Sequence, residues 1–207
     1  MSYVLTLRLD DASFAAFDAL RRRHFPPERN FLPAHVTLFH QLPEDDEAAV
    51  RPVLATAAAA TATFPLEFTG PRSLGRGVAF DVRSDTLLRL RRRLADAFSP
   101  WLTRQDAQGY RPHVTVQNKA TTDAARQLLA ALTTPAADAG AALPPAGSSG
   151  ASRAGAASAT GPVVPPRTGR AEGLLLWRYA GGPWDAVDDY PFHDSTKDGA
   201  WTTAHAH

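Results

Sequence analysis

The stretch Pro33-Ala34-His35-Val36-Thr37-Leu38 contains a tripeptide, His-Val-Thr, that returns in Pro112-His113-Val114-Thr115-Val116. Both stretches are typical of short β-strands, in which the side chains of residues i and i+2 point to the same face. Each tripeptide therefore presents an imidazole and a hydroxyl side by side. Two such pairs facing one cleft would surround a single anion with two proton-transfer groups and two hydrogen-bond donors.

The segments around the two tripeptides repeat as well. Both halves of the chain predict the order strand, helix, His-Val-Thr strand, helix, strand. These elements are expected at 3–9, 11–24, 35–38, 44–60 and 64–69, and again at 77–82, 84–102, 113–116, 121–132 and 173–179. The repeated order indicates an internal duplication, with His35 and His113 at equivalent places in two similar lobes.

The paired tripeptides suit one kind of chemistry. Displacement at a phosphodiester needs a base for the attacking oxygen and an acid for the leaving oxygen, and imidazole serves both tasks near neutral pH. The two Thr hydroxyls would donate to the non-bridging phosphate oxygens. No metal is expected, because the chain has no Cys and no His-Glu-x-x-His motif.

The two His-x-Thr motifs, one in each half, resemble those of the 2H phosphoesterase superfamily, which includes bacterial 2′-5′ RNA ligase-like proteins and RNA 2′,3′-cyclic phosphodiesterases. Three segments carry the resemblance, which extends over 3–134 and 171–192: Leu32 to His40, Tyr110 to Lys119 and Leu174 to Tyr179. The resemblance implies an α+β fold that is bilobal and pseudosymmetric. Two antiparallel sheets, with helices on their outer faces, would enclose the active cleft.

For function, the resemblance implies a metal-independent phosphodiesterase that needs no cofactor. Its substrate would be an RNA 2′,3′-cyclic phosphate or a 2′-5′-linked end. His35 and His113 would be catalytic, and Thr37 and Thr115 would bind the phosphate. Weak analogy with relatives assigns His113 as the base and His35 as the acid, and the reverse stays open. Two alternatives also stay open: a small cyclic nucleotide-like phosphate as the substrate, or a non-catalytic binder of phosphorylated RNA ends.

The sequence departs from the family pattern beside both motifs. Phe39-His40-Gln41 stands where many members have an apolar residue and Gly, and Gln117-Asn118-Lys119 stands where many RNA-processing members carry Arg. Substrate contacts at these places are therefore expected to differ.

Four residues near the motifs are candidate substrate contacts, namely Lys119, Arg111, Phe39 and Tyr110. Lys119 would share the face of His113 if that strand continued for six residues. Strand alternation predicts that His40 lies on the face opposite His35. The arginines of the two Leu-Arg-Arg-Arg runs, 21–23 and 91–93, lie on helices that the resemblance places outside, so they are expected to form solvated helix faces.

Composition bounds the remaining possibilities. A net charge of +1 over 207 residues argues against binding nucleic acid mainly through a basic surface, but allows a small anion or an RNA end. The absence of Cys fits a cytoplasmic protein, and neither a signal peptide nor a membrane-spanning run is found. We expect a monomer with no membrane contact.

We predict one bilobal catalytic domain over 1–192, with lobes at about 1–70 and 71–192 before any exchange of strands. The stretch 135–170 is rich in Ala, Gly, Pro and Ser and contains no aromatic residue. It cannot bury enough apolar surface to offset the entropy of ordering, which predicts a flexible insertion. The tail, 193–207, is expected to be disordered.

Overall fold

The structure is a computed structural model, which describes residues 2–133 and 165–194. Its strands are β1 (Ser2–Leu9), β2 (Val36–Pro43), β3 (Phe64–Ser73), β4 (Val78–Arg83), β5 (His113–Gln117), β6 (Thr168–Tyr179) and β7 (Trp184–Pro191). Its helices are α1 (Asp11–His24), α2 (Glu47–Ala59), α3 (Asp85–Ala97) and α4 (Thr122–Thr133), with short 3₁₀ turns at Pro27–Arg29 and Ser99–Trp101. The predicted elements are therefore present in the predicted order.

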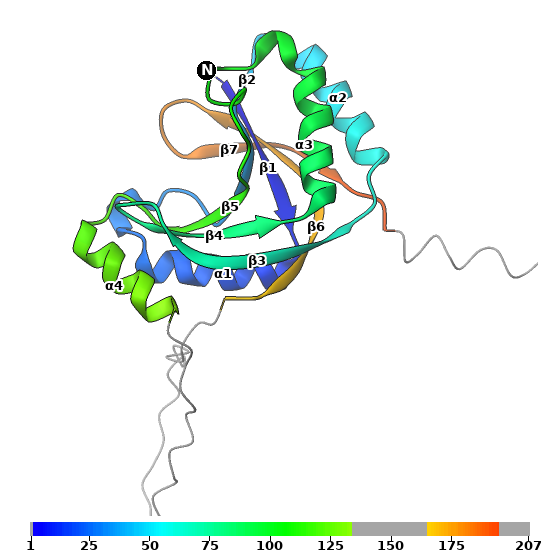
Figure 1. Cartoon of the computed structure of the whole chain (residues 1–207). Helices are drawn as coiled ribbons and strands as arrows, with labels where there is room; N and C mark the ends of the chain where they lie inside the picture. Colours follow the sequence, from blue (N-terminus) through cyan, green and yellow to red (C-terminus); the bar gives the residue numbers. More distant parts are fainter. Residues whose placement is uncertain (1, 134–164, 195–207) are drawn as a thin grey trace, which may run out of the picture.

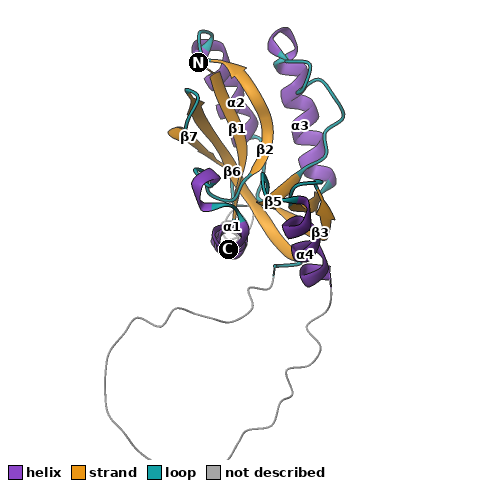
Figure 2. Ribbon diagram, turned by 90° about the vertical axis from the view of Figure 1, so that its left-hand side faces the viewer, coloured by secondary structure: helices purple, strands orange, loops and turns teal. Residues whose placement is uncertain are grey.

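The strands form two groups that join into one continuous sheet. Their order is β1-β2-β5-β4-β3-β6-β7, with a further pairing of β1 and β6, and every pair is antiparallel. One group, β2, β1, β6 and β7, lies with α2 and α3 at one end of the molecule, whereas β5, β4 and β3 lie with α1 and α4 at the other (Figures 1 and 2). The predicted α+β fold of two pseudosymmetric antiparallel lobes is confirmed.

The two repeats exchange strands. The last strand of the first repeat, β3, pairs with β4, and the last strand of the second, β6, pairs with β1. The start of β6 also pairs with β3, so this long strand crosses from one lobe to the other (Figure 2). Because of this exchange, the group of strands that holds each His-Val-Thr strand also contains a strand from the other half of the chain.

Helix α1 shows the consequence of this exchange for packing. Asp10 caps it by accepting a hydrogen bond from the Ser13 backbone N–H, 2.9 Å away. Its fully buried Phe17 packs edge-on against Phe68 of β3, with ring centroids 4.7 Å apart. A helix of the first half thus covers the sheet of the other lobe, beneath β5.

Two predicted boundaries need comment. Strand β6 begins at Thr168, inside the stretch 135–170 that was expected to be flexible, and Gly169 and Arg170 pair with β3. The predicted C-terminal boundary of the flexible stretch, residue 170, was wrong, because residues 168–170 pair with β3. Residues 135–164 lie outside the described residues. His193, the first residue of the expected tail, forms a bridge with Ala62, and residues 195–207 lie outside the described range.

Candidate active site

The two His-Val-Thr tripeptides meet where the lobes touch. Val36 of β2 pairs with Val114 of β5 in antiparallel register, and both side chains are fully buried. This register sets His35 opposite Thr115 and Thr37 opposite His113, all four on the face away from the buried valines. The predicted quartet of two imidazoles and two hydroxyls is thereby brought together on one surface.

Both imidazoles are held in the same way. His35 Nδ1 lies 2.8 Å from the carbonyl oxygen of Pro33, and His113 Nδ1 lies 2.9 Å from that of Arg111. A carbonyl only accepts, so each Nδ1 must carry the proton and donate it. In the neutral ring this leaves the Nε2 lone pair as the reactive atom.

Their electrostatic surroundings differ. Burial and the positive charge of Arg21 together lower the pKa of His35 to about 4, against the opposing effect of the hydrogen bond to Pro33. Burial also lowers the pKa of His113, but there the hydrogen bond to Arg111 and the carboxylate of Asp81 oppose the lowering while Arg72 adds to it. The Asp81 carboxylate therefore favours a positive charge on His113, whereas the Arg21 guanidinium disfavours one on His35.

Asp81 organises the positive charge beside His113. It stands opposite His113 in the β4–β5 register and accepts from Arg72 Nε and from Arg111 Nη2, the latter at 2.7 Å. These two guanidinium groups hold the pKa of Asp81 below its usual range despite partial burial. The candidate contact Arg111 therefore lies next to the site, with its charge engaged by Asp81.

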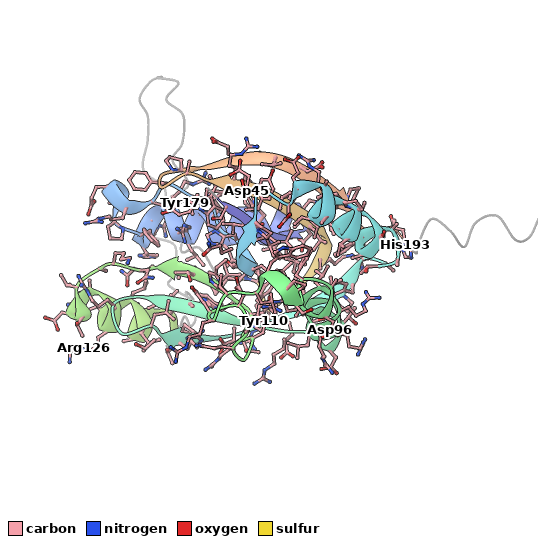
Figure 3. The ribbon with its side chains drawn as sticks, turned by 90° about the horizontal axis from the view of Figure 1, so that it is seen from above. Asp45, Asp96, Tyr110, Arg126, Tyr179 and His193 are labelled. Carbon is pink, nitrogen blue, oxygen red and sulfur yellow. The ribbon has the colours of Figure 1, made fainter. Side chains whose placement is uncertain are left out.

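Three other candidate contacts are placed differently from the prediction. Phe39 is fully buried against Phe98, so it is a core residue and cannot touch a substrate. Tyr110 donates its hydroxyl to the Thr37 carbonyl, 3.1 Å away, and supports the motif from behind rather than stacking on a base. Figure 3 shows Tyr110 on the side of α3 and β4. Strand β5 ends at Gln117, so the face-sharing argument for Lys119 fails.

Two buried arginines brace the motifs, which corrects the expectation that both Leu-Arg-Arg-Arg runs are solvated. Arg21 and Arg91 are only 5% and 6% exposed, while the following arginines are exposed. Arg91 Nε donates to the Leu38 carbonyl at 2.7 Å, and its guanidinium lies over the Phe39 ring. Arg21 plays the matching part for β5. The recurrence of the Leu-Arg-Arg-Arg run in both halves of the sequence was the signal that could have revealed this role, because equivalent positions in a duplicated fold have equivalent surroundings.

His40 lies on the same face as His35 and His113, not on the opposite one. The register pairs Thr6 with Thr37 but Leu5 with Phe39, so Leu38 is an extra residue in β2 and alternation is reversed after it. The charge of His40 accordingly lowers the pKa of both His35 and His113. Its ring and backbone N–H both bond to the buried carboxylate of Asp106, each at 3.0 Å. A bulge of this kind leaves no mark in a single sequence.

Comparison with known proteins agrees with this site. The sequence matches the 2′-5′ RNA ligase superfamily over residues 9–146, a range that contains both His-Val-Thr motifs. The chain belongs to the 2′-5′ RNA ligase superfamily. It is thereby a 2H phosphoesterase, as the resemblance implied. No curated protein matches the sequence.

Solved structures share the fold of this superfamily member. The Thermus thermophilus protein TT0787 superposes with a TM-score of 0.57 at 18% identity, over 94% of this chain and 100% of that one. E. coli LigT complexed with 3′-AMP superposes with a TM-score of 0.53 at 15% identity, over 93% and 98%. A further structure described as a phosphoesterase gives a TM-score of 0.53 at 15% identity, over the same shares. At such identities the likeness is one of fold.

In this superfamily member, a cavity of about 500 Å³ adjoins the face of the sheet that carries His35. Its lining includes His35, Trp177 and Trp184, and the ring centroids of His35 and Trp184 are 4.9 Å apart. Trp177 is held by donating from Nε1 to Thr6 Oγ1, 2.8 Å away. The cavity therefore opens directly beside one of the two imidazoles. Neither tryptophan was among the predicted site residues.

Within residues 2–133 and 165–194, no group of three His, Cys, Asp or Glu side chains is arranged to hold a metal ion. Across the same ranges, no helix has the length and apolar character needed to cross a membrane.

Proposed function

We propose that the protein is a metal-independent phosphodiesterase that acts on RNA 2′,3′-cyclic phosphates or on 2′-5′-linked ends. The observation that carries the proposal is the Val36–Val114 register, which sets the two His-Val-Thr tripeptides side by side in adjacent strands. The Nδ1 hydrogen bonds to Pro33 and Arg111 direct both Nε2 atoms outward, as proton transfer to and from a substrate requires. Membership of the 2′-5′ RNA ligase superfamily supports the same reaction class.

The electrostatic surroundings of His35 and His113 favour one assignment of roles. The proton of the singly protonated pair resides on His113, because burial and Arg21 disfavour a positive charge on His35. His35 Nε2 then accepts a proton from the attacking water as its oxygen bonds to phosphorus. The bond between phosphorus and the ribose 2′ or 3′ oxygen breaks, and that oxygen takes the proton from His113. This assignment reverses the one suggested by analogy with relatives.

The two Thr hydroxyls, and the two arginines that donate to Asp81, complete the proposed reaction centre. Thr37 and Thr115 would each donate to a non-bridging oxygen, where charge grows in the transition state. Arg72 and Arg111 would supply positive charge on the His113 side. One donor of this kind is commonly worth about 10²–10³ in rate, and one positioned acid or base about 10²–10⁴.

The test is hydrolysis of a short RNA ending in a 2′,3′-cyclic phosphate, with EDTA present and the monophosphate product identified. We expect a single 2′- or 3′-phosphate product, and loss of turnover in folded His35→Ala and His113→Ala variants. Unchanged turnover in either folded variant would contradict the proposal. Loss of activity upon EDTA addition would contradict metal independence alone.

A second measurement assigns the roles. Bis(p-nitrophenyl) phosphate has a leaving group that departs without a proton, so it needs the base but not the acid. We expect His113→Ala to keep activity on this diester and His35→Ala to lose it. The opposite pattern would make His113 the base.

A further inference from the structure

The cavity beside His35 has aromatic walls. Besides Trp177 and Trp184 it is lined by Phe14 and Phe31, so four aromatic rings surround its volume of about 500 Å³. That volume is ample for one nucleoside and is continuous with His35. Flat aromatic walls suit a flat ligand, and bases in single-stranded RNA are commonly held by stacking on such rings.

The exposure of two of these rings points to a ligand. Phe31 is 62% exposed and Phe14 is 39% exposed, and they are two of the four large hydrophobic side chains that the described residues leave exposed. The tertiary structure gives them little burial, yet both line the cavity that reaches the catalytic His35. A stacked base would cover them and remove their apolar surface from water.

The charges of the cavity argue against a second phosphate. Its one positive side chain, among the residues that line it, is Arg8, which is paired with Asp189 at 2.6 Å. The carboxylates of Asp11 and Glu172 also line the cavity, and they repel a phosphate. A carboxylate accepts hydrogen bonds only, so it matches a ligand edge made of donors.

Guanine has that edge. Its N1–H and N2–H donors are adjacent and parallel, so both can bond to a single carboxylate, whereas adenine, cytosine and uracil each place an acceptor beside their donor. Glu172 is the half-buried carboxylate of the two and lies on β6, in the same strand as Trp177. It is therefore the better placed to read the base.

We propose that this cavity binds the base of the nucleoside whose phosphodiester is cleaved, and that it binds guanine best. The inference rests on the proposed function, because it takes His35 as the point where phosphate and base subsites meet. The substrate is then an RNA end, or a mononucleotide, with guanosine at the cyclic phosphate.

The first experiment compares kcat/KM for the four nucleoside 2′,3′-cyclic phosphates. We expect the guanosine compound to be hydrolysed at least about 10-fold more efficiently than the others. The variant Glu172→Gln should remove most of this preference by lowering kcat/KM for the guanosine compound alone. Equal values for the four compounds, or a preference that Glu172→Gln leaves intact, would overturn the guanine assignment.

The second experiment tests the aromatic walls with a matched control. Phe31→Ala should raise KM for the guanosine compound by about 5- to 100-fold, as loss of one stacking ring does. Leu88→Ala removes another exposed apolar side chain, on α3 and away from the cavity, and should leave this KM unchanged. An unchanged KM in Phe31→Ala would overturn the base subsite.

A direct binding measurement separates this inference from the reaction. Guanosine 3′-monophosphate should quench the tryptophan fluorescence of the wild-type protein, and the quenching should weaken in Phe31→Ala. Hydrolysis of bis(p-nitrophenyl) phosphate without such quenching would overturn the base subsite and leave the reaction class standing. Quenching without any His-dependent hydrolysis would support the subsite and overturn the proposed function.

Discussion

Arg21 of α1 donates from Nη1 to the backbone carbonyl of Thr115, 2.9 Å away in the opposite His-Val-Thr strand. The same guanidinium donates from Nε to the carbonyl of Leu32, at 2.9 Å, in the turn that leads to His35. One buried side chain therefore connects both halves of the candidate site. Burial lowers the pKa of Arg21 to about 10, so it remains charged at neutral pH and also holds a proton off His35.

Replacement of Arg21 should affect stability and rate together. We expect Arg21→Met to cost about 2–4 kcal/mol of the free energy of unfolding, because buried carbonyls lose their donors. It should also lower kcat by at least about 10-fold, since small displacements of a positioned group are costly. Urea unfolding and steady-state kinetics measure the two effects.

The control for this change is Arg22→Met. Arg22 is the exposed neighbour of Arg21, and its guanidinium pairs with the carboxylate of the buried Asp18. We expect it to cost less than about 1 kcal/mol and to leave kcat unchanged. Equal effects of the two variants would contradict a special role of Arg21.

The rate should depend on pH through both histidines. Their pKa values are lowered in the empty site, that of His35 to about 4 and that of His113 also below its ordinary value of about 6.5. The base His35 becomes active as pH rises through about 4, and the acid His113 is lost as pH rises through its own pKa. The profile of kcat/KM should therefore be bell-shaped, with its maximum below about pH 6.5.

Trp184 provides a way to move one limb of this profile. Its ring lies against the His35 ring, with centroids 4.9 Å apart, and so covers one side of the imidazole. Trp184→Ala should raise the pKa of His35 toward its ordinary value, which shifts the acidic limb of kcat/KM to higher pH and leaves the alkaline limb in place. A shift of the alkaline limb instead would show that His35 is the acid.

Much of this site could be predicted because the signal was local and repeated. The alternation around His35 and His113, together with the order of elements, was enough to predict the bilobal fold and the paired motifs. The positions of Arg21 and Phe39 could not be predicted in this way. Whether a helical arginine is solvated or buried depends on which sheet the helix covers, and the exchange between the repeats decides that.

The prediction that His40 lies on the face opposite His35 was wrong for a different reason. Simple alternation fails after the extra residue Leu38, and the bulge depends on how β1 pairs with β2 rather than on β2 alone. The cavity was missed for a similar reason. Phe14, Phe31, Trp177 and Trp184 come from distant parts of the chain, and only the folded structure brings them together.

The Thr hydroxyls should matter less than the imidazoles. Valine has the shape of threonine without the hydroxyl, so Thr37→Val and Thr115→Val remove only the donor to the phosphate. We expect each to lower kcat by about 10- to 100-fold, less than the loss of either His. The pH profile of kcat/KM should stay in place, because no charge changes. A reduction below about 3-fold, measured on the cyclic-phosphate RNA, would remove that Thr from the reaction centre.

Asp106 should stabilise the β2 bulge. Its buried carboxylate accepts from the backbone N–H groups of His40 and Gln41 and from the His40 ring, each at 3.0 Å, and these bonds hold the pKa of Asp106 below its ordinary value against the effect of burial. We expect Asp106→Asn to cost about 2–4 kcal/mol at about pH 7, because an amide is a weaker acceptor and brings an unwanted donor. Asp96→Asn, at an exposed position on α3 (Figure 3), should cost less than about 0.5 kcal/mol.

The sign of the pH dependence makes this last prediction specific. A carboxylate with a lowered pKa stabilises the folded state fully above its unfolded pKa of about 3.9, and the contribution is lost as pH falls through the folded pKa. The difference in unfolding free energy between wild type and Asp106→Asn should therefore shrink as pH falls below about 3.9. Chemical denaturation at a series of pH values measures it. A difference that does not shrink in acid would mean that the side chain acts by its shape and not by its charge.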